Sequence, residues 1–176
     1  MLSLNDPVWY ELTSAYGGDC EDLLEWLRTA ASGGFSRKLL DDIVNDANHQ
    51  GDTSTSMYAV AIVLIDLAAR QSEVMRSACL IAAGMLYADS GKPGAVPCPQ
   101  SLLDKFEASS AAGRRLLLDT GNDRGGFIPH LYFLAALSGF SGYKKFGRLL
   151  EGFDESNGEY CHTWIDGVLP DPDDGG

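Results

Sequence analysis

The stretch that decides the fold class is residues 54–71, which read STSMYAVAIVLIDLAARQ. Apolar side chains occupy nearly every position between Met57 and Leu67, so no face is left for solvent. The β-branched residues would permit a strand, but the length of the run and its alanines favour a helix. A helix that is apolar all round is buried on all sides. We therefore expect a central helix enclosed by the rest of the chain.

The segments around this run carry the start and stop signals of further helices. Asp6-Pro7 predicts a helix start and Gly17-Gly18 a stop, while Asp19 and Ser36 are suited to cap the next two helices. More helices are expected from residue 72 onward and at about 99–119, 128–137 and 142–150, with a proline-rich loop at 91–99. No hairpin signal interrupts the series. The sequence predicts an all-α fold of antiparallel helix pairs, either a HEAT-like helical repeat or a compact helical bundle.

The length and composition indicate one globular domain and a polar end. We expect a single helical domain over residues 1–169 and a disordered acidic tail at 170–176. The N-terminus lacks the basic start and apolar core of a signal peptide, and no apolar run approaches the ~20 residues of a membrane span. The four cysteines form no close pair, so no disulfide framework or zinc site is expected. These features predict a cytoplasmic protein with no membrane partner, metal or cofactor.

The charge is strongly acidic and unevenly distributed. The chain of 176 residues has 25 Asp or Glu and 13 Lys or Arg, which gives a formal net charge of −12. Residues 1–66 carry −8, residues 67–150 carry +4, and residues 151–176 carry −8. Direct binding to nucleic acid is disfavoured, because phosphate contacts need a basic face. A cationic protein is the natural electrostatic complement.

Few residues suggest catalysis. His49 lies near the predicted end of a helix, where an imidazole can cap carbonyl groups. Cys161-His162 is the one adjacent thiol–imidazole pair, and a single pair cannot close a four-ligand zinc site. No nucleophile elbow, phosphate loop or metalloprotease motif occurs. We expect no catalytic residues and no enzyme activity; a hydrolase that uses His49 or the Cys161-His162 pair is a less favoured hypothesis.

Two acidic groups are candidates for contact with a partner. The first covers two neighbouring predicted helices: acids crowd the second helix at Asp19, Glu21, Asp22 and Glu25, and more follow on the third. On the third helix, like charges four residues apart cost a few tenths of a kcal/mol and suggest an anionic surface kept for binding. The second follows residue 150, where acids alternate with aromatic side chains as at protein interfaces. Simple solubility explains the first group equally well, and aromatic residues that pin the chain end to the core would explain the second. The predicted partner-binding residues are Asp41, Asp42, Asp46, Glu151, Asp154, Glu155, Glu159, Tyr160 and Trp164.

A family resemblance covers about residues 9–69. The letters AYG stand at residues 15–17, an acidic helix follows, and HQG at residues 49–51 precedes the long apolar helix. This order resembles a family of small bacterial HEAT-repeat-like proteins of the toxin-immunity type, from which the chain departs at Asp52. The resemblance implies a helical scaffold without catalytic residues. It also implies a role as an immunity protein for a secreted toxin, including the nuclease effectors of type VI secretion.

The sequence thus leads to one expected function and one alternative. The expected function is that of a cytoplasmic immunity protein whose acidic surfaces bind and neutralise a cognate toxin, a cationic nuclease. The alternative is a non-enzymatic helical-repeat adaptor that joins two cellular proteins.

Overall fold

The structure of the chain is a computed structural model that describes residues 2–49, 52–120 and 127–151. Those ranges contain seven α-helices. They are α1 (Glu21–Thr29), α2 (Arg37–Ala47), α3 (Ser56–Ala68), α4 (Glu73–Asp89), α5 (Gln100–Asp119), α6 (Phe127–Phe140) and α7 (Lys144–Glu151). Short elements complete the order: a 3-10 helix η1 (Pro7–Glu11), a π-helical end to α1 called η2 (Ala30–Gly34), and the two-residue strands β1 (Asn48–His49) and β2 (Asp52–Thr53). The predicted all-α fold class is confirmed.

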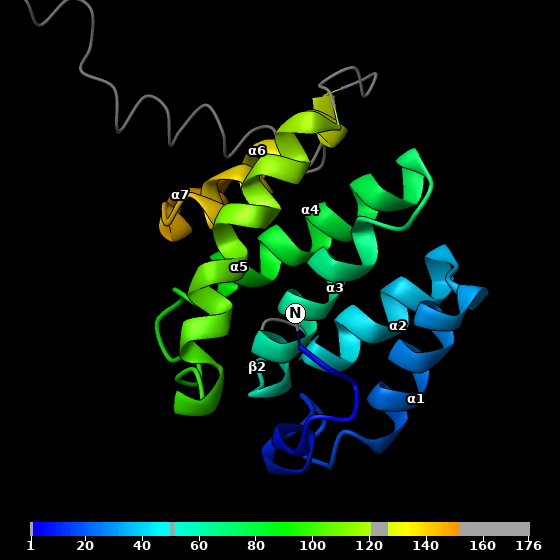
Figure 1. Cartoon of the computed structure of the whole chain (residues 1–176). Helices are drawn as coiled ribbons and strands as arrows, with labels where there is room; N and C mark the ends of the chain where they lie inside the picture. Colours follow the sequence, from blue (N-terminus) through cyan, green and yellow to red (C-terminus); the bar gives the residue numbers. More distant parts are fainter. Residues whose placement is uncertain (1, 50–51, 121–126, 152–176) are drawn as a thin grey trace, which may run out of the picture.

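The apolar run that decides the fold class forms α3, and α3 is the centre of the core. Every residue of this helix except Asp66 is buried. Helices α2, α4 and α5 pack around it. Figure 1 shows α1 and α2 on one side of α3 and α4, with α5, α6 and α7 on the other side. A single cluster of buried apolar side chains extends from Leu2 to Phe140.

Helices α4 and α6 approach each other closely at two glycines. A Cβ atom added to Gly84 would lie 2.5 Å from the Cβ of Ala136, and one added to Gly139 would lie 2.1 Å from the carbonyl oxygen of Gly84. No side chain fits at either position without displacing a backbone. The small residues therefore set the distance between α4 and α6, and α7 packs on both of these helices.

The N-terminal segment differs from its prediction. The helix expected from residue 7 to residue 17 is only the 3-10 turn η1, after which Leu12 is extended with φ −92° and ψ 154°. Long-range hydrogen bonds replace the helical ones, because the N–H of Thr13 donates to Thr55 Oγ1 at 2.8 Å and the N–H of Ala15 donates to the carbonyl of Asp46 at 2.7 Å. These partners are far away in sequence, so local start and stop signals could not reveal them.

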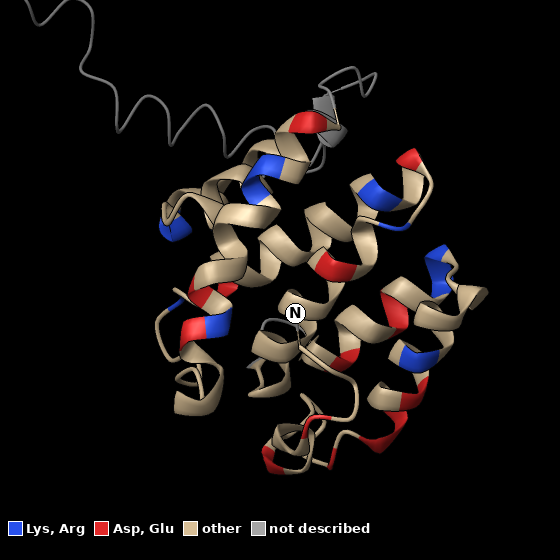
Figure 2. Ribbon diagram, in the orientation of Figure 1, with Lys and Arg blue, Asp and Glu red and all other residues tan. Residues whose placement is uncertain are grey.

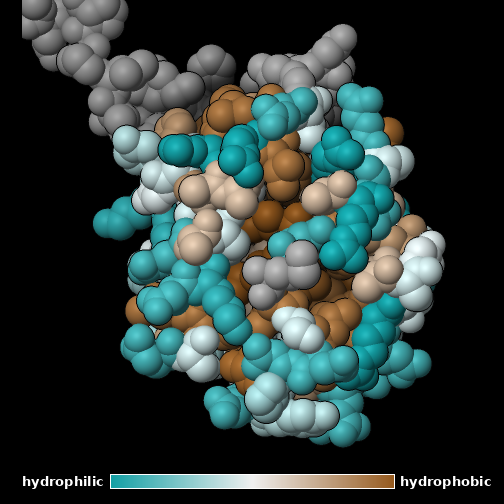
Figure 3. Space-filling view, viewed as in Figure 1, coloured by the Kyte–Doolittle hydropathy of each residue, from teal (hydrophilic) through white to brown (hydrophobic). Residues whose placement is uncertain are grey.

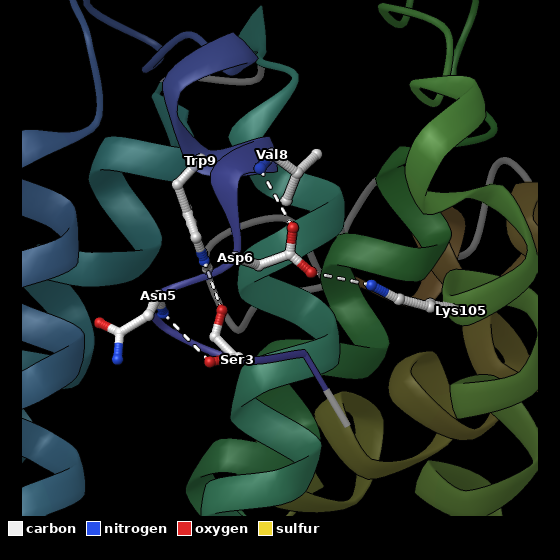
Figure 4. Close-up of polar contacts among 6 residues, drawn as sticks. All are labelled: Ser3, Asn5, Asp6, Val8, Trp9 and Lys105. Carbon is white, nitrogen blue, oxygen red and sulfur yellow. Dashed lines mark hydrogen bonds and ion pairs between the residues drawn. The ribbon is translucent and has the colours of Figure 1, made fainter.

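Asp6 anchors this segment, as Figure 4 shows. Its carboxylate accepts from the N–H of Val8 at 3.1 Å and pairs with Lys105 Nζ of α5 at 3.0 Å. The hydrogen bond with Lys105, followed by that with Val8, lowers the pKa of Asp6. Trp9, 1% exposed, donates its indole N–H to the carbonyl of Ser3 at 3.0 Å. These contacts hold the segment on the core. In Figure 3, hydrophobic side chains gather in the middle of the face shown, between hydrophilic edges.

The other local predictions have mixed outcomes. Ser36 Oγ accepts from the N–H of Leu39 and caps α2, as expected. Asp19 was expected to cap α1, but the N-cap residue is Cys20, and the Asp19 carboxylate before it accepts from the N–H of Glu21. The prediction that no hairpin interrupts the helices was wrong, since β1 and β2 pair antiparallel with Asn48 opposite Thr53. The predicted tail at 170–176 lies outside the described residues. No described helix combines the length and the apolar character that crossing a membrane requires.

Candidate interaction surface

Asp41 and Asp42, predicted to contact a partner, lie on the outer side of α2 and are paired within that helix. Arg37 Nε is 3.2 Å from Asp41 Oδ1, and Lys38 Nζ is 2.7 Å from Asp42 Oδ2. Both pairs have the i, i+4 spacing that brings side chains together on a helix. The outer side of α2 is therefore charge-balanced, which differs from the anionic surface expected there.

Asp46, the third predicted residue on α2, is not a surface residue. Its exposed fraction is 9%, and its Oδ2 atom is buried without a hydrogen-bond partner. Desolvation and then the nearby charge of Asp22 raise the pKa of Asp46. The prediction of a solvent-facing partner contact was wrong here, because this face of α2 turns toward the start of α1, where Cys20 and Asp22 lie.

The predicted C-terminal group lies almost wholly beyond the described residues. The backbone of Glu151 ends α7. The other five predicted residues, Asp154, Glu155, Glu159, Tyr160 and Trp164, fall in the segment that the structure does not describe. Their role as partner contacts stays a prediction.

A different acidic surface lies on α1 and the turn before it. Its carboxylates are all exposed, and none pairs with a basic side chain within the described ranges. We call it the acidic α1 surface and define it by Glu11, Asp19, Glu21, Asp22 and Glu25. Figure 2 shows acidic residues concentrated around α1 and the N-terminal segment, at the lower right of the molecule. The local charge is thus uncompensated here, unlike on α2.

The sequence held a signal that separates the two surfaces. On α2 each acid at residues 41 and 42 is preceded four residues earlier by Arg37 or Lys38, in register for an ion pair. On α1 the residue four positions before Glu25 is Glu21, a like charge. A count of acidic residues alone overlooks this difference. For that reason the predicted partner contacts were placed on α2.

Two large tyrosines stand in the chain beside the acidic α1 surface. Tyr10, which precedes Glu11, is 80% exposed, and Tyr16, three residues before Asp19, is 63% exposed. Exposed aromatic side chains with a polar tip are enriched where proteins bind each other. Carboxylates next to such side chains can attract a cationic partner and give it apolar contact area.

Tyr16 also joins the two parts of the AYG and HQG pattern. Its hydroxyl lies 2.9 Å from His49 Nδ1, and the two rings lie 4.7 Å apart between centroids. His49 is therefore a strand residue held by Tyr16, in place of the helix-capping role expected from the sequence. The contact fixes the turn before α1 against the end of α2.

The described cysteines lack the activation that nucleophilic chemistry requires. Burial raises the pKa of Cys20 to about 11 and that of Cys98 to about 11. Burial also raises the pKa of Cys79 to about 12, against the opposing charge of Arg37. A reactive cysteine needs a lowered pKa, because the thiolate is the nucleophile. The Cys161-His162 pair lies outside the described residues, and within them no three His, Cys, Asp or Glu side chains are grouped to hold a metal ion.

Hollows on the described surface include one near α4 and one between α2 and α4. One, about 490 Å³, lies beside the loop after α4, where Tyr58, Phe106 and Lys144 contribute to its wall. Burial raises the pKa of Tyr58 to about 12, so its hydroxyl stays neutral. The other, about 830 Å³, is a groove between α2 and α4 with an apolar floor and polar ends.

Comparisons with known proteins returned no matching family model, no matching curated protein and no matching solved structure.

Proposed function

We propose that this protein is a cytoplasmic immunity protein, which binds a cationic protein toxin through the acidic α1 surface and thereby neutralises it. The observation that carries the proposal is the set of exposed carboxylates on α1 and its preceding turn, which have no basic partner within the described ranges. A nuclease is the toxin class that suits this surface best, because an enzyme that binds phosphates presents a basic cleft.

Electrostatics supports a docking role for this surface. Glu21 and Glu25 are both exposed and lie at the i, i+4 spacing of a helix, where like charges repel. A base at either position would relieve the repulsion, as Arg37 and Lys38 do on α2. Uncompensated charge of one sign attracts an oppositely charged partner and speeds its association.

The tyrosines supply the second component of such an interface. Charge steers an encounter, but residence time depends on well-packed contacts that exclude water. Tyr10 makes no hydrogen bond within the described part of the chain and is free to pack on a partner, whereas Tyr16 is positioned by His49. The AYG and HQG resemblance, in which these elements characterise toxin-immunity proteins, points to the same part of the molecule.

Co-expression tests the proposal. The protein is produced together with the product of each gene adjacent to its own, and growth and tag-based pull-down are measured. We expect one adjacent product to be toxic alone, harmless with this protein, and recovered with it. The triple variant E21K/D22K/E25K should lose the protection, while D41K/D42K, a double reversal on α2, should retain it.

Two outcomes would reject the proposal. If no adjacent product is toxic and none is recovered with the protein, there is no cognate toxin to neutralise. If several unrelated cellular proteins are recovered instead, the helical-repeat adaptor is the better account.

A further inference from the structure

The groove between α2 and α4 is a feature separate from the acidic α1 surface. Its floor is apolar and is formed by Leu40, Val44, Ala78, Ile81, Ala82 and Met85. Arg37 and Asp41 stand at the end where α2 begins. The groove follows α2 for about 11 residues, which is roughly 16 Å at the helical rise.

The far end of the groove is polar and has an unfilled hydrogen-bonding position. The side-chain amide of Asn48 donates to Asp89, the last residue of α4, and Asp89 also lies 3.5 Å from Arg148 of α7. Oδ1 of Asn48 is buried and has no hydrogen-bond partner in the described part of the chain. A buried acceptor without a donor is costly, so a donor entering this end of the groove would stabilise it.

The chain leaves α7 next to this groove. Leu150, one residue before the end of α7, packs with Leu131 and Ala135 of α6. Tyr132, the neighbour of Leu131 on α6, lines the groove. Arg148 of α7 also lies 3.5 Å from Asp89, which lines the groove, so the described end of α7 is near it. Nine extended residues can span up to about 30 Å.

The geometry points to residues 152–176 of this chain as the occupant of the groove, with Tyr160 and Trp164 in contact with its apolar floor. Side chains four residues apart fall on the same side in a helix and also in a strand, so both aromatic residues can face the floor in either conformation. The indole N–H of Trp164 is a donor of the kind that Asn48 Oδ1 lacks.

The charges along the groove are mixed, since Arg37, Asp41 and Asp89 line it, so its apolar floor is the feature that favours the aromatic residues of the segment. The segment 152–176 has seven acidic residues and no Lys or Arg. Arg37 at the rim of the groove is paired with Asp41, and Asp89 at the other end lies 3.5 Å from Arg148. The inference gives the aromatic residues of the segment an internal role, and it does not depend on the proposed function.

Cross-linking within the full chain tests the inference, using Cys161 as the natural reporter in the segment. In a Cys98→Ser background, Met85→Cys places a thiol on the groove floor. Val74→Cys places one on the same helix at a site that is 82% exposed and does not line the groove. The rate of intramolecular bridging by a short bismaleimide is followed by mass spectrometry and by mobility under denaturing conditions.

We expect Met85→Cys to bridge to Cys161 at least ~10-fold faster than Val74→Cys, because docking raises the effective concentration of the two thiols. Trp164→Ala should bring the first rate down toward the second. Ala82→Cys repeats the test at a neighbouring floor position if Met85→Cys does not fold. Equal rates for groove and control positions would overturn the inference, and so would bridging that joins two chains in place of one.

Discussion

The hydroxyl of Tyr16 lies 2.9 Å from Nδ1 of His49, a contact between residues that are 33 positions apart in the sequence. It closes the turn before α1 onto β1, at the corner where α2 ends. The backbone reinforces the same corner through the hydrogen bond from Ala15 N–H to the carbonyl of Asp46. The start of the acidic α1 surface is thereby fixed relative to the rest of the fold.

Tyr16→Phe should lower the free energy of unfolding by about 0.5–1.5 kcal/mol, the net contribution of a typical hydrogen bond. Urea denaturation followed by circular dichroism measures the change. Tyr10→Phe is the matched control, since Tyr10 is exposed and its hydroxyl has no partner within the described residues. If both variants unfold at the same urea concentration as the parent, the Tyr16–His49 contact does not stabilise the corner.

Substitutions at the close approach of α4 and α6 should lower the free energy of unfolding more than Tyr16→Phe does. Gly139→Ala should destabilise the protein by about 1–3 kcal/mol or more, because its new methyl group would meet the backbone of α4. Gly84→Ala should behave likewise against Ala136. At Gly18 the nearest atom to an added Cβ is 4.0 Å away, so Gly18→Ala is the control. Thermal unfolding of the three variants should separate the first two from the third; similar midpoints would mean that α4 and α6 are not held at this distance.

Replacement of the buried Asp46 by asparagine should give a gain in stability that depends on pH. Its pKa in the folded protein is raised by desolvation and by Asp22, so the charged form costs stability above that pKa. Asp46→Asn should therefore stabilise the fold near pH 7, because it removes the disfavoured charge and keeps the shape of the side chain.

The advantage of Asp46→Asn should shrink as the pH falls through the folded pKa. It should vanish below the unfolded value of about 3.9, where the carboxyl is protonated in both states. Urea denaturation at several pH values measures the difference, with Asp42→Asn as an exposed control. A difference that stays constant with pH would contradict the assignment of a buried, charge-disfavouring site.

The sequence predicted the helices well where the signal is local. The apolar run of α3, the cap at Ser36 and the proline-rich loop after α4 depend on neighbouring residues, and each is found in the structure. The turn after η1 was missed because long-range hydrogen bonds, such as that from the N–H of Thr13 to Thr55 Oγ1, determine it. The β1–β2 pair joins neighbouring residues, Asn48 with Thr53, but each strand has only two residues and is too short to show an alternating pattern.

The candidate site was predictable in kind but not in position. Acid content indicated an anionic surface, yet it did not show that Asp46 is buried or that Arg37 and Lys38 neutralise the outer side of α2. The i, i+4 pairs could have been read from the sequence. The orientation of Asp46 depends on how α2 packs against α1, which no local pattern encodes.

Helices α1 and α2 allow a matched comparison of surface charge. Two carboxylates can be removed from either helix with the same change in net charge. Glu21→Gln/Glu25→Gln removes uncompensated charge from α1, whereas Asp41→Asn/Asp42→Asn removes charge that Arg37 and Lys38 already balance. We expect the α1 variant to associate more slowly with a cationic toxin, by roughly 3- to 10-fold at low salt, and the α2 variant much less. The difference should diminish as salt is added, since screening weakens steering.

The association rate constant of these two variants with the toxin recovered by co-expression is the most direct test, measured by stopped-flow mixing at low and at physiological salt. A lower rate for the α1 variant alone, converging with the parent at high salt, is the result that binding through the acidic α1 surface predicts. Equal rates for the parent and both variants, or a larger loss for the α2 variant, would contradict it.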